Sequence, residues 1–230
     1  MHRPFQMLPA RNPALDAVTL ARDLVAGTRG RLVGPGGLYN AGNAVGLAMG
    51  IGLQVAVLPA ESRGLGEILA ATFGYLGGNP AALALTGATA IFFVSGEAYH
   101  RAWAHGAPPV EALNRRGDLL SGIGALVLGL ALLGLGQVAL ALTAGLLHAL
   151  GKFGSAGHWR PLRGWRRDWP DFWRSLVLAS RIPAVLATVL GLLDLLAAGA
   201  PTLALLTPLT LLVCYAFWCR ADLMLLAPAR

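Results

Sequence analysis

The sequence predicts an all-α fold, a polytopic membrane bundle of six transmembrane helices arranged as three hairpins with both termini cytoplasmic. Composition is the first observation, because 56% of the residues are hydrophobic and 13% are charged, whereas soluble domains average about 25% charged. Residues 119–151 are uncharged, and as one helix they would span about 50 Å. A bilayer core is only about 30 Å thick, so this stretch predicts two helices joined by a turn at residues 134–137.

The N-terminal segment, residues 1–36, precedes the predicted six-helix domain of residues 37–226. Asn12 and Pro13 are typical of a helix start, and Ala17, Leu20 and Leu24 then follow on one face. We expect an amphipathic helix that ends near Gly27 and lies along the inner membrane surface. The alternative is a helix packed under the bundle or against a partner.

The six predicted spans follow from the uncharged tracts, each of which holds about 20 residues. They are Gly37–Leu58, Pro80–His100, Leu119–Leu135, Gln137–Phe153, Trp173–Leu196 and Thr202–Leu223. A second interfacial segment is expected over Glu67–Leu76. The second helix of each hairpin opens alike, with Ala-Leu-rich sequence before Thr86, Thr143 and Thr207. Either a repeated hairpin or the abundance of Ala and Leu accounts for this likeness.

Orientation follows from the arginine-rich connections, since cytoplasmic loops retain basic residues. Six spans place three basic segments on one side: the N-terminal segment, the connection after span two, and the inner-face loop 152–174. A five-span chain would export this most basic loop. The sequence also has 17 arginines and one lysine beside abundant Ala, Gly and Leu, which favours a GC-rich genome and the bacterial inner membrane as the location.

Arginine and tryptophan alternate in the inner-face loop. Its members include Arg160, Arg163, Trp165, Arg166, Arg167 and Trp169. Such a segment can stack on nucleic acid, but its place between two spans favours the anionic headgroups of the inner leaflet, to which each basic residue adds about 1 kcal/mol. We therefore expect lipid, and no nucleic acid, as its partner.

Glycines recur at helical spacing inside two spans. Gly42, Gly46 and Gly50 form a small-xxx-small row in span one, and Gly122 and Gly129 are seven residues apart in span three. Small residues let membrane helices approach closely. These glycines predict tight internal packing, with contact to a second copy or to another membrane protein as the alternative.

Polar side chains inside the spans are the candidate functional residues. Glu97 in span two and Arg181 in span five lie at comparable depth, and an ion pair would offset the cost of burying each. A proton or ion relay is the alternative. Asn43 and Gln54 are expected to share a face of span one, where their amides either bridge helices or line a solute path.

No cofactor, metal site or catalytic motif is predicted. Glu97 and His100 have the spacing of one half of a di-iron site, but a second Glu-x-x-His is absent from the sequence. Residues 145–152 miss the phosphate-loop spacing, and Cys214 and Cys219 are expected to be packing residues. The sequence thus favours a non-catalytic accessory or scaffold subunit of a membrane assembly. The alternative is a small-solute or ion transporter that uses Asn40, Asn43, Gln54 and Glu97.

Overall fold

A computed structural model describes residues 34–57, 64–105, 108–157 and 170–226. These residues form helices and connecting turns, with no β-strand among them. The helices are α2 (Pro35–Val57), α3 (Leu65–Gly78), α4 (Pro80–Ala102), α5 (Glu111–Gly134), α6 (Val138–Leu140), the π-helix η2 (Ala141–Leu147), α7 (His148–Gly157), α8 (Pro170–Ala179), α9 (Ile182–Ala197) and α10 (Thr202–Leu226).

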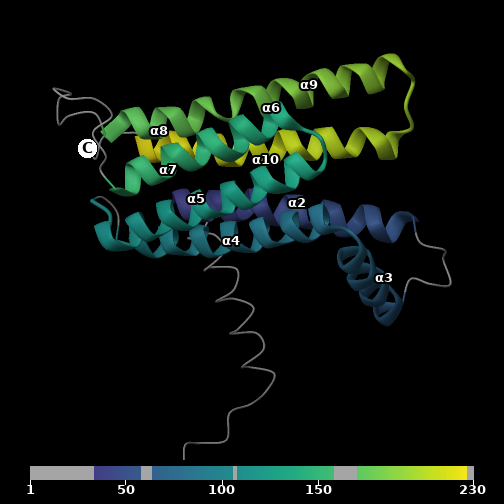
Figure 1. The fold of residues 1–230 in the computed structure, drawn as a ribbon, viewed down its shortest axis with the longest axis horizontal. Helices are drawn as coiled ribbons and strands as arrows, with labels where there is room; N and C mark the ends of the chain where they lie inside the picture. Colours follow the sequence, from purple (N-terminus) through teal and green to yellow (C-terminus); the bar gives the residue numbers. More distant parts are fainter. Residues whose placement is uncertain (1–33, 58–63, 106–107, 158–169, 227–230) are drawn as a thin grey trace, which may run out of the picture.

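The long helices run side by side along one axis, and the chain reverses direction at each connection between them (Figure 1). Helix α4 packs against α2 and α5, α7 packs against α5 and α8, and α10 packs against α8, α9 and α2. The helices therefore close into a ring in sequence order. We call the end where α2 begins and α10 ends the charged end, and the opposite end the turn end.

Two Schellman motifs close the turn end, and each depends on a glycine with positive φ. Gly136 (φ 74°) follows α5, and Gly199 (φ 62°) follows α9. The amide of Gln137 donates to Leu132 at 2.8 Å, and the amide of Ala200 donates to Leu195 at 2.9 Å. Glycine adopts this left-handed conformation without a Cβ penalty. The turn predicted at residues 134–137 is confirmed.

Helix α4 begins at a polar cap. The side chain of Asn79 accepts a hydrogen bond from the amide of Ala82 at 3.0 Å, and Pro80 occupies the first turn, where no backbone donor is needed. The preceding helix, α3, contains no buried residue and leans away from the bundle axis in Figure 1. Helix α3 covers the predicted interfacial segment Glu67–Leu76; its position relative to a membrane stays a prediction.

Two of the long helical rods are interrupted. Between α6 and α7 the chain widens into the π-helix η2. Between α8 and α9 the helix breaks at residues 180–181. Pro183 follows in the first turn of α9, and it has no amide hydrogen to continue the helical hydrogen bonds. Both interruptions lie within helices that are long enough to span a bilayer.

Five helices are long and apolar enough to cross a membrane, which supports an integral membrane protein. They are Pro80–Ala102, Glu111–Gly134, Val138–Gly157, Phe172–Ala197 and Thr202–Leu226. Large residues such as Leu130 and Leu190 are more than 60% exposed, while alanines such as Ala125 and Ala221 are buried. Leucine outward and small residues inward is the arrangement expected in lipid.

The predicted boundaries need two corrections. Helix α5 begins at Glu111 and not near Leu119, because the charged first turns that hydropathy excludes still form helix. Helix α2 matches the predicted first span in extent, but it is not among the five candidate spans, so six spans stay a prediction. The predicted N-terminal amphipathic helix and most of the inner-face loop lie outside the described residues.

Candidate functional site

The only lysine of the chain, Lys152, lies buried near the charged end. It is 2% exposed, although the sequence places it at the edge of a loop. Its ammonium Nζ donates to the hydroxyl of Tyr99 at 3.0 Å and to that of Tyr39 at 3.2 Å. The two tyrosine rings lie against each other, with centroids 5.3 Å apart. Lys152 of α7 therefore joins α2 and α4 through their phenols.

Each tyrosine connects the lysine to a carboxylate. The hydroxyl of Tyr39 donates to Oδ1 of Asp222, and that of Tyr99 donates to Oδ1 of Asp118. The ammonium itself lies 3.5 Å from Oδ1 of Asp118 and 3.8 Å from Oδ1 of Asp222. Two equivalent series of contacts therefore start at the ammonium group, and each runs from the lysine through a tyrosine to an aspartate. The ammonium group has three hydrogens to donate, so it can supply both.

The second oxygen of each carboxylate also has a partner. Nε of Arg181 donates to Oδ2 of Asp222 at 2.5 Å, and the hydroxyl of Ser155 donates to Oδ2 of Asp118 at 3.1 Å. We call the six residues the central ion network: Tyr39, Tyr99, Asp118, Lys152, Arg181 and Asp222. With both aspartates ionised, its two cations balance its two anions.

Every crossing of the bundle supplies one member of this network. Asp118 lies seven residues after the start of α5, and Lys152 lies five residues before the end of α7, so both sit within about two helical turns of the charged end. The break before α9 places Arg181 at the N-cap of that helix, where its guanidinium also lies 5.5 Å from the ring of Trp218.

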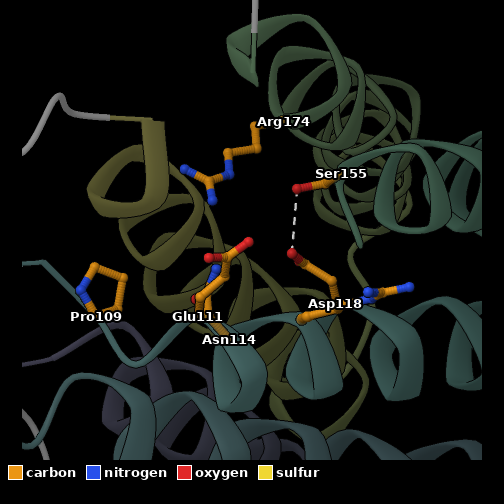
Figure 2. Close-up of a pocket in the computed structure, with 7 residues that line it drawn as sticks. Pro109, Glu111, Asn114, Asp118, Ser155 and Arg174 are labelled. Carbon is orange, nitrogen blue, oxygen red and sulfur yellow. Dashed lines mark hydrogen bonds between the residues drawn. The ribbon is translucent and has the colours of Figure 1, made fainter. Parts of the chain in front are cut away.

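A polar pocket of about 230 Å³ reaches the network from outside. Pro109, Glu111, Asn114, Arg115, Asp118, Ser155 and Arg174 line it. Figure 2 shows the side chain of Arg174 above that of Glu111, with the Ser155–Asp118 hydrogen bond to one side of both. Arg174 also donates to the carbonyl of Leu225 at 2.6 Å. The pocket therefore places positively and negatively charged side chains near Asp118, which is the member of the central ion network in its lining.

A second buried pair lies one helical turn deeper than Lys152. Nδ1 of His148 is 3.0 Å from the hydroxyl of Ser180, and both residues are buried. The other ring nitrogen, Nε2, has no hydrogen-bond partner among the described residues. His148 is therefore a buried titratable group outside the central ion network but adjacent to it.

The predicted ion pair between Glu97 and Arg181 is wrong. Glu97 pairs with Arg101 four residues later on its own helix, at 2.9 Å, and Arg181 pairs with Asp222. The depth of the two residues in their spans was an insufficient guide, because the rotation of each helix decides which residues face one another. The Glu97 side chain is 33% exposed, so its local pair is a surface feature.

The two predicted amides have separate outcomes. Asn43 is 6% exposed and accepts a hydrogen bond from Nε1 of Trp218 at 3.1 Å, so it bridges α2 and α10, as one of its two predicted roles requires. The side chain of Gln54 lies outside the described part of the chain, as do Arg160, Arg163, Trp165, Arg166, Arg167 and Trp169 of the inner-face loop. Headgroup binding by that loop stays a prediction.

Glycines of α2 do not all have the same surroundings. A Cβ atom placed on Gly42 would lie 2.5 Å from Nε1 of Trp218, and one on Gly46 would lie 3.5 Å from Sγ of Cys214. Both glycines therefore face α10 of the same chain. A Cβ atom on Gly50 would meet no heavy atom within 4 Å, which leaves this position open to lipid or to a partner.

In α5 the two predicted glycines lie against the fourth predicted span. A Cβ atom on Gly122 would lie 2.6 Å from the ring of Phe153, and one on Gly129 would lie 3.2 Å from the Cα atom of Gly145. The Gly129–Gly145 contact joins two backbones at the π-helix η2. This approach depends on the absence of both side chains.

The described residues contain no group of three or more His, Cys, Asp and Glu that could hold a metal ion. Comparisons of the chain with protein families, curated proteins and solved structures found no match. The geometry of the described residues is therefore the basis for inferring function.

Most members of the central ion network were not predicted from the sequence. Asp118 and Lys152 only bound the uncharged tract of residues 119–151, and Asp222 lies inside the last predicted span, Thr202–Leu223, where no role was assigned to it. One signal was present in the sequence: Lys152 is the only lysine among 18 basic residues. The tyrosines carried no signal, because a tyrosine near a span end is equally typical of a membrane interface.

Proposed function

We propose that this protein is a transporter of a small solute or ion, and that the central ion network is its coupling site. The observation that carries this proposal is that α2, α4, α5, α7, the α8–α9 junction and α10 each contribute one side chain to a cluster of two cations and two carboxylates around Lys152. An ionisable residue inside a membrane domain is a functional candidate by default. Here four such residues are in contact.

Stability alone is a poor explanation for the network. The cost of removing charges from water often exceeds their mutual attraction, so buried ion pairs are weak stabilisers compared with apolar packing. The two tyrosines and Ser155 supply additional hydrogen bonds that a purely apolar core would not need. These features favour a cluster retained for function.

The interrupted helices also support transport. Secondary transporters commonly bind ions and substrates where a membrane helix is broken, and π segments are frequent at functional sites. The break before α9 positions Arg181, and the π-helix η2 ends at Leu147, directly before His148. The polar pocket then provides access from the charged end as far as Asp118.

In this proposal α2 is the sixth span, and both termini lie in the bacterial cytoplasm. Helix α2 has 23 residues, as many as α4, and packs along both α4 and α10. The first turns of α2 supply Tyr39 to the network. This part of α2 therefore lies at the same depth as the helix segments that supply the other members. The arginine-rich connections place the charged end on the cytoplasmic side.

A non-catalytic accessory subunit is the second candidate, and one observation favours it. An apolar groove of about 530 Å³ opens between α2 and α10, lined by Val45, Ala48, Met49, Gly52, Leu53, Leu203, Leu206 and Thr210. Gly50 lies on the same helix with open space beside it. A helix of a partner or of a second copy would find an apolar surface there, with small residues at Ala48 and Gly52.

Purified protein in liposomes tests the transport proposal. We would record charge movement on solid-supported membranes during challenge with a panel of small cations, anions and zwitterions. We expect currents from the wild type that Lys152→Met abolishes. Arg101→Met is the matched control, because it removes a cation that is 68% exposed. Equal currents from wild type and Lys152→Met would contradict the proposal, and a stable co-purifying membrane partner would favour the accessory role.

A further inference from the structure

The imidazole of His148 has a defined tautomer, which follows from its partner. The hydroxyl of Ser180 lies 2.6 Å from the carbonyl oxygen of Val177 and 3.0 Å from Nδ1 of His148. A carbonyl oxygen can only accept, and a serine hydroxyl has one hydrogen. The Ser180 hydrogen is therefore used on Val177, so Nδ1 of His148 must donate its own hydrogen to Ser180.

Nε2 is consequently the basic nitrogen of a neutral imidazole. It is buried, and no described residue donates a hydrogen bond to it. Buried polar atoms are nearly always hydrogen-bonded, and exceptions often mark a functional group. The lone pair of a neutral imidazole nitrogen accepts a proton, and the proton is the smallest ligand that this atom can bind.

We propose that Nε2 of His148 is the proton-binding site that couples proton movement to the central ion network. This inference rests on the proposed transport function and names its coupling ion. In the step itself, a hydronium ion transfers a proton to the Nε2 lone pair and becomes water, and the imidazole charge rises from zero to +1. Nδ1 keeps its hydrogen bond to Ser180, and no other bond changes.

The consequence of protonation follows from the surrounding charges. Lys152 lies one turn along the same helix, Arg181 lies at the α8–α9 junction, and Asp222 lies on α10; these are the charged groups that act on His148. Beyond Lys152 stand Asp118 of α5 and the phenols of Tyr39 and Tyr99. A network of zero net charge would then face an added positive charge beside its two cations. Their mutual repulsion would favour separation of α7 from the α8–α9 junction.

The test is nitrogen NMR on the full-length protein in lipid nanodiscs with ¹⁵N-labelled histidine. The measured variant carries His2→Gln, His100→Gln, His105→Gln and His158→Gln, which leaves His148 as the only histidine and the buried site unaltered. We expect an unprotonated Nε2 and a protonated Nδ1 at about pH 8, and conversion to the imidazolium on acidification. Ser180→Ala in the same background should introduce the opposite tautomer.

A protonated Nε2 at about pH 8, or an imidazole that stays neutral over the whole acid range in which the protein stays folded, would overturn the inference. Flux distinguishes this failure from failure of the proposed function. Wild-type transport that persists unchanged in its pH dependence in His148→Gln would reject the proton site but keep the transporter. Protonation of His148 without any transport by the wild type would reject the transporter but keep the proton site.

Discussion

At the scale of single residues, charge balance decides what the central ion network tolerates. Each of its four charged groups contacts one of opposite sign, and none of the four is more than 13% exposed. Removing one partner leaves an uncompensated charge in a medium that solvates it poorly. Removing an opposite pair keeps the balance. A paired substitution should therefore lower the free energy of unfolding by less than the single substitution does.

The substitution Lys152→Met tests this reasoning. It leaves Asp118 and Asp222 with one cation between them, and we expect a loss of about 3–5 kcal/mol in the free energy of unfolding. Adding Asp118→Asn restores zero net charge and should recover part of the loss. Arg101→Met should cost about 1 kcal/mol or less, since that pair is exposed. Reversible unfolding in mixed micelles measures all three.

A double variant that is no more stable than Lys152→Met would show that charge balance is not what the network requires. The cause would then be the lost contacts of the ammonium group itself, which donates to the hydroxyls of Tyr39 and Tyr99 and lies 5.1 and 5.0 Å from their ring centroids.

At the scale of helices, the contact between α5 and η2 depends on glycine in both partners. The chain widens into the π-helix where the Gly129 and Gly145 backbones meet. This crossing lies on the turn-end side of His148 and Lys152, which follow on α7. The contact therefore sets how closely α7 can approach α5, and hence the separation of Lys152 from Asp118.

We expect Gly145→Ala to be destabilising and Gly50→Ala to be neutral or stabilising. A Cβ atom on Gly145 would lie 2.5 Å from Cα of Gly129, so the two helices must move apart, at a cost of about 1–3 kcal/mol. Gly50 has open space around it, and alanine in a helix interior is favoured by about 0.5–1 kcal/mol. Unfolding of the two variants under identical conditions compares them. Equal stabilities would contradict the close approach.

At the scale of the whole molecule, closure of the ring brings the two ends of the chain's helical domain together. Tyr39 near the start of α2 contacts Asp222 near the end of α10, and the packing of α2 on α10 continues along Gly42 and Gly46. An odd number of crossings would place these two residues at opposite ends. The contact between them therefore supports an even number of crossings, which the six-span proposal requires.

Cysteine accessibility tests this topology in a background carrying Cys214→Ala and Cys219→Ala. Cysteines at Gly34 and Gly157, at the charged end, should label from one side of the membrane. Cysteines at Ala56 and Gly134, at the turn end, should label from the other side. If positions 34 and 56 label from the same side, α2 does not span the bilayer and the six-span proposal is wrong.

Helix positions were more predictable than helix contacts. The turn at Gly136 and the start of α4 at Pro80 follow from local chemistry, which sequence reports directly. The pairing of Arg181 with Asp222 joins residues that are 41 positions apart. Depth along two helices can be read from sequence, whereas their relative rotation cannot, and for this reason Glu97 was assigned to the wrong partner.

The sequence by itself determined that this is a helical membrane protein and where most of its helices turn, because lipid requires long uncharged segments and turns require glycine, proline or asparagine. Only the tertiary structure decided that Asp118, Lys152 and Asp222 meet in one buried network instead of marking three helix ends. The physical reason is that a charge near the end of a span has two low-energy environments, the aqueous interface and a buried partner of opposite sign. Packing of the neighbouring helices decides which environment is available.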